Sequence, residues 1–398
     1  MCSANRNDIL PEPTEELKQL SAELANRIRQ KIVQHGPLAF SEYMEMALYE
    51  PGLGYYSAGL QKFGEGGDFV TAPQLGSVFA RCLARQVEQV GATLGHYEIV
   101  EAGAGSGILA ADLLKALQDI GPPVRYRILE RSAHLRQVQK ETLEQYVPGW
   151  MDRISWLDEP PAEKWQGVFL ANEVLDALVV ERFCIGEDGP LMMRVTTGPD
   201  GFEWLESPCP EEVHRRIEAI FSGLGHYPAT GYRSEINTSL PAWLNAVTAS
   251  LDKGLALFVD YGYARREFYG PQRSDGTLIC HYRQRAHGDP FKWPGLTDIS
   301  ASVDFTALAE AADMCGLEVS GYTTQSMFLL ACGMDEMIAG TDSLPASERI
   351  SINSQVRRLT LPGEMGERFQ AMALSRGLDD DLAEDLRGFS ISDLCHRL

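Results

Sequence analysis

Hydrophobic positions change their spacing along the chain near residue 96. Before that point, apolar residues recur every three or four positions, which predicts amphipathic helices over residues 14–34 and 40–48 and again from residue 75. From residue 96 onward, short apolar runs alternate with helical stretches. Because this alternation is typical of parallel strands joined by crossover helices, we predict an α/β fold with a mostly parallel sheet.

The same pattern indicates the domain organisation. We expect an N-terminal helical, substrate-side region at residues 1–95, which includes a Gly-rich loop, and a sheet domain at residues 96–398. Residues 182–232 break the strand–helix rhythm and are expected to be an insertion of short strands and one helix, the latter over residues 206–220. An irregular, substrate-side segment is expected at about residues 263–298.

Charge and cysteine usage narrow the expected partners. The net charge of −21 argues against a large nucleic-acid footprint and favours a basic peptide over RNA. The eight cysteines include no CxxC pair, so we predict no metal site. The sequence shows no apolar stretch of membrane-spanning length and no signal or transit peptide, so a cytoplasmic protein without a membrane partner is expected.

A glycine-rich motif lies between a predicted strand and a predicted helix. It begins at Glu101 and places glycines at 103, 105 and 107, where they let the backbone pass close to a ligand. A dinucleotide fingerprint, GxGxxG, would need its third glycine at residue 108, which is Ile. We therefore assign Glu101, Gly103, Gly105 and Gly107 to S-adenosyl-L-methionine binding on a Rossmann-like sheet. A nicotinamide-dependent oxidoreductase is the less favoured alternative.

Acidic and amide side chains follow the next predicted strands. Glu130 ends the second strand, where a carboxylate can accept hydrogen bonds from ribose hydroxyls. Asp158, after the third strand, could meet the adenine edge or be a solvated loop acid. Asn172, Glu173 and Asp176 follow the fourth strand, whose carboxyl end is expected to face the ligand crevice. We assign Asn172 to the cofactor. The sequence NEVL at 172–175 disfavours methylation of a nucleobase amino group, which would use a (D/N)PPY-type motif.

Glu173 and Asp176 are the predicted catalytic residues. A guanidinium is a poor nucleophile because its lone pair is delocalised, and paired carboxylates could fix its geometry by bidentate hydrogen bonds. Methyl transfer otherwise depends mostly on proximity and orientation. From spacing alone, the alternative that these two acids cap the following helix stays open.

Several longer segments resemble the MidA-like family of class I S-adenosylmethionine-dependent methyltransferases, which is related to the mitochondrial complex I assembly arginine methyltransferase. The resemblance runs from about residue 36 to 390, and the matching segments include GGDFVTAPQLGSVFAR at 66–81, EAGAGSGILAADLL at 101–114, ANEVLDAL at 171–178, LFVDYGY at 257–263 and GTLICHYRQRAHGDPF at 276–291. It implies a seven-stranded sheet, an added helical region and S-adenosyl-L-methionine as cofactor.

The resemblance also implies site residues and an acceptor. By motif match it implies that the site is lined by Gly66, Gly67, Asp68, Thr71 and Pro73, and that Asp260, Tyr261 and Gly262 border the same crevice. Two positions depart from the family pattern: Val179 replaces a proline and Ser302 a histidine. For the mitochondrial members the resemblance implies symmetric dimethylation of an arginine on a respiratory complex subunit.

Together, these observations predict a bacterial, cytoplasmic methyltransferase that acts on an arginine-bearing protein substrate. The alternative is a non-catalytic assembly factor that binds S-adenosyl-L-methionine or a partner. The sequence leaves a homodimer open.

Overall fold

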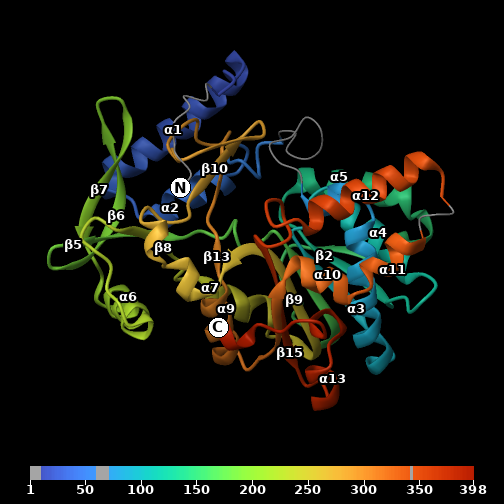
Figure 1. The fold of residues 1–398 in the computed structure, drawn as a ribbon. Helices are drawn as coiled ribbons and strands as arrows, with labels where there is room; N and C mark the ends of the chain where they lie inside the picture. The colour runs from blue at the N-terminus through green and yellow to red at the C-terminus, as the bar shows by residue number, and fades with distance from the viewer. Residues whose placement is uncertain (1–9, 60–70, 341–343) are drawn as a thin grey trace. The chain divides into compact units, whose positions relative to one another are not determined.

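The chain folds into two compact units, each built from several separate segments (Figure 1). A computed structural model describes residues 10–59, 71–340 and 344–398. The first unit, which we call the accessory unit, combines the described part of residues 1–70 with residues 179–236 and 276–301. The second, the sheet unit, combines residues 71–178, 237–275 and 302–398.

This division differs from the single boundary that we predicted between residues 95 and 96. The helix α3 (Val78–Leu94) belongs to the sheet unit, because its apolar stripe is buried in the same core as the sheet. Residues 179–236 and 276–301 join the N-terminal helices in the accessory unit. The chain therefore leaves the sheet unit twice and returns to it.

Within the described residues, seven strands form the path of the central sheet, in the order β14-β15-β9-β4-β1-β2-β3 (Figure 1). Antiparallel pairing joins β15 to both of its neighbours, while the other pairs are parallel, so the prediction of a mostly parallel seven-stranded sheet is confirmed. The strands span β1 Glu98–Ala102, β2 Arg125–Leu129, β3 Ile154–Leu157, β4 Trp165–Asn172, β9 Leu251–Tyr263, β14 Glu318–Thr324 and β15 Phe369–Arg376, and the short β13 (Val303–Asp304) pairs with β9.

Both faces of this sheet are buried, which explains why its strands appear in the sequence as continuous apolar runs. Successive residues alternate between two hydrophobic clusters: Ile99 and Val168 belong to one, and Val100 and Phe169 to the other. The second cluster is completed by helices α7 (Leu240–Thr248) and α9 (Phe305–Met314), whose buried residues include Leu244, Val247, Leu308 and Ala311.

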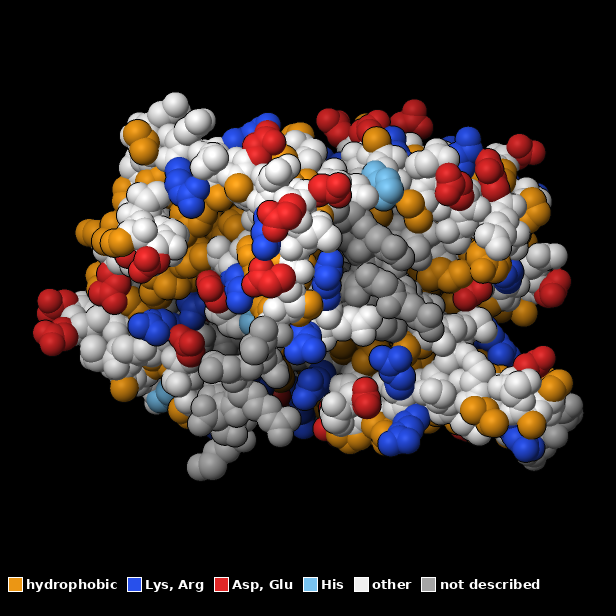
Figure 2. Space-filling model, turned by 90° about the horizontal axis from the view of Figure 1, so that it is seen from above, with side chains coloured by type: hydrophobic (Ala, Val, Ile, Leu, Met, Phe, Trp, Pro, Cys, Tyr) orange, Lys and Arg blue, Asp and Glu red, His pale blue; other side chains and the backbone are white. Residues whose placement is uncertain are grey.

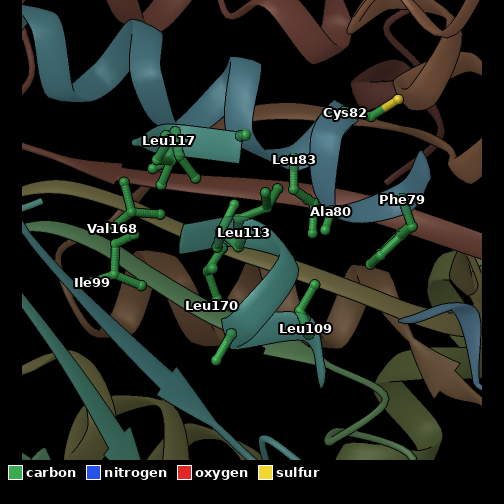
Figure 3. Close-up of a cluster of buried hydrophobic side chains, with 14 of the residues drawn as sticks. Phe79, Ala80, Cys82, Leu83, Ile99, Leu109, Leu113, Leu117, Val168 and Leu170 are labelled. Atoms are coloured by element: carbon green, nitrogen blue, oxygen red, sulfur yellow. The ribbon is translucent and has the colours of Figure 1, made fainter. Parts of the chain in front are cut away.

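Helices α3 and α4 (Ile108–Leu117) complete the first cluster (Figure 3). Leucines recur at positions 109, 113 and 117, and this four-residue spacing places them on one face of α4. In Figure 3 they lie beside Ile99 of β1 and residues of β4, Val168 and Leu170. This packing fixes the direction in which α4 leaves the glycine-rich loop at its N-terminus.

The accessory unit contains α1 (Glu15–His35) and α2 (Phe40–Tyr49), as the spacing predicts. Antiparallel pairing joins four further strands in the order β7-β6-β5-β8, with bounds β5 Glu181–Gly186, β6 Gly189–Gly198, β7 Gly201–Pro208 and β8 Arg233–Ile236. The expected insertion of short strands and a helix is therefore present. Its helix, α6 (Glu211–Leu224), begins later than predicted because β7 continues to Pro208 and Pro210 forms the N-cap.

The segment expected to be irregular contains a small sheet. Strands β10 (Ile279–Tyr282), β11 (Arg285–His287) and β12 (Asp298–Ser300) pair in the order β11-β10-β12. The prediction missed them because strands of three or four residues carry too little periodicity to detect. The remaining helices are α5 Ala133–Tyr146, α8 Arg265–Phe268, α10 Gln325–Ala331, α11 Met334–Ala339, α12 Ala346–Thr360 and α13 Asp380–Glu384, with 3-10 helices at Ala72–Leu75, Pro148–Arg153, Pro271–Arg273, Arg387–Phe389 and Cys395–Arg397.

The surface mixes charges of both signs. Asp and Glu side chains share the face drawn in Figure 2 with Lys and Arg, although acidic residues outnumber basic ones by 56 to 35 in the whole chain. None of the helices in the described part of the chain is both long and apolar enough to cross a bilayer.

Two glycines allow the central strands to pair closely, which leads to a stability prediction. A Cβ atom at Gly254 of β9 would lie 1.9 Å from the carbonyl oxygen of Gly167 on β4, and the φ of Gly254 is +149°. We expect Gly254→Ala to lower the free energy of unfolding by about 3 kcal/mol, because it adds backbone strain and a collision inside the sheet. Urea denaturation measures this loss. Gly149→Ala, at a site with open space around the added Cβ, is the control and should be near neutral.

Candidate functional site

Polar residues lie in a row at the carboxyl ends of the central parallel strands. Ala102 of β1 pairs with Leu129 of β2 on one side and with Ala171 of β4 on the other. Because the strands end in register, the residues that follow each of them share one edge of the sheet. The strand order reverses between β1 and β4, and open α/β sheets bind their ligands at such a point.

The glycine-rich loop between β1 and α4 requires its glycines. Gly103, Gly105 and Gly107 have φ angles of +64°, +53° and +83°, a region that other residues rarely adopt. A Cβ atom on Gly103 would lie 2.8 Å from Cγ2 of Val174, and one on Gly107 would lie 3.1 Å from Cα of Gln139. The loop is therefore held in left-handed turns between the connection after β4 and helix α5.

Glu101 belongs to strand β1 and precedes this loop. Its side chain is buried, and Oε2 accepts a hydrogen bond from the Tyr126 hydroxyl at 2.8 Å. Burial raises the pKa of Glu101 to about 7, and the hydrogen bond from Tyr126 opposes the rise. This hydrogen bond links the end of β1 to β2. A direct contact between Glu101 and the cofactor stays a prediction.

Glu130 is held by donors at both oxygens. Oε1 accepts from the backbone N–H of Ser132 at 2.8 Å and Oε2 from Nε2 of Gln139 at 3.2 Å. Burial raises its pKa, and these hydrogen bonds counteract the rise. A carboxylate oxygen has two lone pairs, so each can accept a further hydrogen bond from a vicinal diol. The arrangement suits the predicted ribose contact.

Asp158 is much more exposed than Glu130. Its side chain is 84% exposed, and Oδ1 accepts a hydrogen bond from Nη2 of Arg136 at 2.7 Å. Arg136 also donates from Nε to the backbone oxygen of Glu130 at 2.7 Å. The arginine thus fixes Asp158 beside the end of β2, while its predicted contact with adenine stays a prediction.

Three carboxyl groups gather at the ends of β4 and β9: Glu173, Asp176 and Asp260. Glu173 has a φ of +55°, an uncommon value for a residue other than glycine, and its N–H donates to the carbonyl oxygen of Val259 at 2.9 Å. Its Oε1 accepts from the N–H of Ala72 at 3.3 Å and from Nδ2 of Asn172 at 3.1 Å. Strain of this kind often occurs at functional sites.

Asp260 holds the turn that follows β4. Its Oδ2 accepts hydrogen bonds from three consecutive backbone N–H groups, those of residues 174, 175 and 176, at 3.0, 2.8 and 3.3 Å. Its Oδ1 accepts from the N–H of Tyr261 at 2.9 Å. The motif match indicated Asp260 as a border of the crevice but did not reveal this role, because three amides converge on one oxygen only once the chain has folded.

The alternative role for Glu173 and Asp176, as caps of a following helix, is wrong. Residues 173–180 form a turn and an extended segment without a helix. The backbone N–H groups that a cap would satisfy are bonded to Asp260 instead. Neither acid therefore caps a helix.

Burial and mutual repulsion shift the pKa values of the cluster. Burial, with a smaller contribution from Asp176, raises the pKa of Glu173 to about 8. Burial raises the pKa of Asp176 to about 6, while the Tyr261 hydroxyl lowers it. Burial and the two neighbouring acids also raise the pKa of Asp260. At neutral pH the cluster therefore retains a proton on Glu173. Among the described residues, no group of His, Cys, Asp and Glu has an arrangement that could hold a metal ion.

The segment at residues 71–75 reaches this cluster through one backbone contact. Thr71 is partly exposed, and Pro73 is buried in the 3-10 helix that follows it. Between them, Ala72 donates its N–H to Glu173. This contact brings the predicted residues Thr71 and Pro73 to the acid cluster. Gly66, Gly67 and Asp68, which were predicted with them, lie outside the described residues.

Comparison with known proteins identifies the family. A family model described as "Putative S-adenosyl-L-methionine-dependent methyltransferase" matches residues 78–323. The chain belongs to this family. It is also similar to a COG1565 superfamily member from Burkholderia thailandensis, crystallised with bound S-adenosyl-homocysteine, at 40% sequence identity and a TM-score of 0.92 over 98% of this chain and 100% of that one.

The chain is also similar to animal proteins whose names specify arginine as the methylated residue. The chain is 25% identical to the protein arginine methyltransferase NDUFAF7 homolog, mitochondrial, of Drosophila melanogaster, over 92% of this chain and 88% of that protein. It is 28% identical to protein arginine methyltransferase NDUFAF7, mitochondrial, of Danio rerio, over 88% of this chain and 86% of that protein. The resemblance to S-adenosylmethionine-dependent methyltransferases related to the mitochondrial arginine methyltransferase is confirmed.

The protein is thus an S-adenosyl-L-methionine-dependent methyltransferase, and the nicotinamide alternative is not favoured. The residues at the strand ends fit this cofactor. Within the described part of the chain, Oδ1 of Asn172 is buried and accepts no hydrogen bond, so it is available to a donor such as the amino group of the methionine moiety. Glu130 offers acceptors to ribose, and the glycine loop leaves backbone accessible between them. The individual contacts of these residues with the cofactor stay predictions.

The left-handed geometry of the loop leads to a prediction about cofactor binding. We expect Gly105→Val to weaken binding of S-adenosyl-L-methionine by about 100-fold or more, because a β-branched side chain disfavours a φ of +53° and occupies the predicted methionine position. Calorimetric titration measures the loss, and the melting temperature shows whether the variant is folded. Normal binding by the folded variant would mean that the pocket lies elsewhere.

The raised pKa of Glu173 leads to a prediction about stability. The folded protein binds this proton more tightly than the unfolded chain, in which the pKa is 4.5, so the wild type loses stability as the pH rises from 4.5 to about 8. Glu173→Gln removes this loss. Its free energy of unfolding should therefore rise relative to wild type as the pH rises from about 4.5 to about 8 and stay higher above that. Urea denaturation at each pH measures the difference, and Glu159→Gln, at an exposed loop position, is the control. A constant difference would contradict the burial of an acid at position 173.

Proposed function

We propose that this methyltransferase modifies arginine side chains of a protein substrate. The observation that carries the proposal is the acid cluster formed by Glu173, Asp176 and Asp260 at the ends of β4 and β9, beside the strand-order reversal where the cofactor is expected. The names of the animal relatives, which match nearly the whole chain, support the same acceptor.

The chemistry of the acceptor explains why such a cluster would be useful. The cofactor supplies an electrophilic methyl group on a sulfonium. A guanidinium is planar and positively charged, and its lone pairs are delocalised, so its orientation must be imposed. Two carboxylates can accept parallel N–H bonds from it and hold one nitrogen in line with the methyl group. Glu173 and Asp176 are the residues proposed for this task.

Charge balance in the cluster favours a cationic ligand. Glu173 carries a proton near neutral pH because its buried surroundings, and to a smaller extent Asp176, disfavour a negative charge there. A guanidinium beside it would lower the pKa of Glu173, because an opposite charge stabilises the carboxylate. An uncharged acceptor would leave Glu173 protonated, and the cluster would then bind it more weakly than a guanidinium. The excess of acidic residues in the chain also suits a basic peptide.

A non-catalytic assembly factor, the alternative from the sequence, is not favoured. The family is one of S-adenosyl-L-methionine-dependent methyltransferases, and the site retains both the glycine loop and the acid cluster. The identity of the acceptor protein is a further question. A subunit of a respiratory complex, which the sequence resemblance implies for mitochondrial members, is the first candidate to test.

The proposal predicts that the two acids are needed for transfer but not for cofactor binding. We expect a variant with Glu173→Gln and Asp176→Asn to lose about 100-fold or more of its methyl transfer to an arginine-containing substrate, because the guanidinium is no longer held. Transfer of a labelled methyl group measures activity, and calorimetry with S-adenosyl-homocysteine should give an affinity close to that of the wild type.

The matched control removes the same charges elsewhere in the sheet unit. Asp152 and Glu159 are exposed, and the combination Asp152→Asn and Glu159→Gln should leave transfer unchanged. The acceptor with lysine in place of arginine should not be methylated. Unchanged turnover in the Glu173/Asp176 variant, or equal methylation of the lysine form, would overturn the proposed role.

A further inference from the structure

A buried glutamine interrupts the apolar face of α5. Leu135, Gln139 and Leu143 recur at four-residue spacing, and all three are buried. Gln139 is 0% exposed. A buried carboxamide is unfavourable unless its polar atoms are hydrogen-bonded, so an apolar residue would be the simpler choice for packing. Gln139 must therefore have hydrogen-bond partners inside the protein.

The carboxamide of Gln139 is hydrogen-bonded to three separate parts of the sheet unit. Nε2 donates to the backbone oxygen of Gly105 at 3.1 Å and to Oε2 of Glu130 at 3.2 Å. Its Oε1 accepts from Nε1 of Trp156, on β3, at 2.9 Å. Both N–H groups of the amide are used. The side chain thus connects the loop after β1, the end of β2 and the strand β3.

Helix α5 approaches the loop closely enough for this because of Gly107. A Cβ atom at Gly107 would lie 3.1 Å from Cα and 3.3 Å from the backbone oxygen of Gln139. Any other residue at 107 would push the helix away from the loop. The third glycine of the motif therefore serves the contact with Gln139 as well as the turn itself.

Gln139 also determines how the Glu130 carboxylate is oriented and charged. The N–H of Ser132 holds one oxygen and Gln139 holds the other, so the plane of the carboxylate is fixed. The hydrogen bond from Gln139 lowers the pKa of Glu130, as does the nearby charge of Arg136. Arg136 itself is paired with Asp158.

We propose that Gln139 is a positioning residue of the cofactor site, which fixes the glycine loop and the Glu130 carboxylate as one binding surface. It acts through these two partners and does not itself touch the cofactor. The inference rests on the predicted contact of Glu130 with ribose, and it is independent of the acceptor that the enzyme methylates.

Removal of the amide should weaken cofactor binding in a characteristic way. Gln139→Met keeps the length and most of the volume of the side chain but cannot hold Gly105 or Glu130. We expect S-adenosyl-homocysteine to bind about tenfold more weakly or worse, because two donors to the site are lost. Without the bond from Gln139 the pKa of Glu130 rises further, so binding should also begin to fail at a higher pH as the solution is acidified.

Two control variants separate this role from a structural one. Gln137→Met changes an exposed residue on the same helix, whose Nε2 donates to Glu141 at 2.7 Å, and should bind as the wild type does. Trp156→Phe removes the donor to Oε1 of Gln139 but leaves both of its bonds to the site. It should lower the melting temperature without moving the pH dependence of binding. Calorimetry of each folded variant across the acidic pH range gives both quantities.

A double-variant cycle with Glu130→Gln tests whether Gln139 acts through Glu130. If it does, the loss in the combined variant should be clearly smaller than the sum of the two single losses, because both changes remove the bond between Gln139 and Glu130 and only the contact with Gly105 adds to it. Additive losses, or wild-type affinity and pH dependence in Gln139→Met, would overturn the inference. An unchanged affinity in Glu130→Gln would contradict the contact of Glu130 with ribose and would overturn the inference with it. None of these outcomes bears on arginine transfer, which is measured separately.

Discussion

The parallel pairing of β1 with β4 is the constraint on which the site depends. The two strands pair in register, and the sheet continues beyond β1 to β2 and β3 and beyond β4 to β9. Connections on the two sides therefore diverge and leave the strand ends accessible between them. The glycine loop, Glu130, Asn172 and the acid cluster all lie at or near the carboxyl ends of strands in this arrangement. A shift of register by one residue in one of these strands would turn the side chains of that strand to the other face.

The acid cluster shows how the sheet supports a costly arrangement of charges. Burial of several carboxyl groups together is unfavourable, and the raised pKa values of Glu173, Asp176 and Asp260 express this cost. Three backbone amides on one oxygen of Asp260 offset part of it and define the turn after β4. The left-handed backbone of Glu173 then directs its side chain towards Ala72 and Asn172. The turn is held at its start by β4 and along its backbone by Asp260 of β9.

Gln139 performs the corresponding task on the other side of β1. Its amide is hydrogen-bonded to the carbonyl of Gly105, the carboxylate of Glu130 and the indole of Trp156. A fully satisfied polar network in a buried place is rigid, because each member loses hydrogen bonds if it moves. In both halves of the site, therefore, a buried polar side chain, Asp260 or Gln139, fixes the groups that are expected to face the ligand.

The sequence by itself determined the elements of the sheet unit and the class of cofactor. Continuous apolar runs and four-residue leucine spacing identified β1, β4 and α4 because both faces of the sheet and one face of each helix are buried. The glycines at 103, 105 and 107 were recognisable because no other residue adopts their backbone angles easily. The motif at 171–178 identified Glu173 and Asp176, but their alternative role as helix caps could not be dismissed from spacing.

Tertiary structure alone decided which distant groups meet. The hydrogen bonds of Asp260 to residues 174–176 and of Gln139 to Gly105 join parts of the chain that are far apart in sequence, and local patterns carry no record of such contacts. The same holds for the assignment of α3 to the sheet unit and of residues 179–236 to the accessory unit. Hydrophobic periodicity reports that a face is buried, but the partner that buries it is chosen by packing of the whole chain.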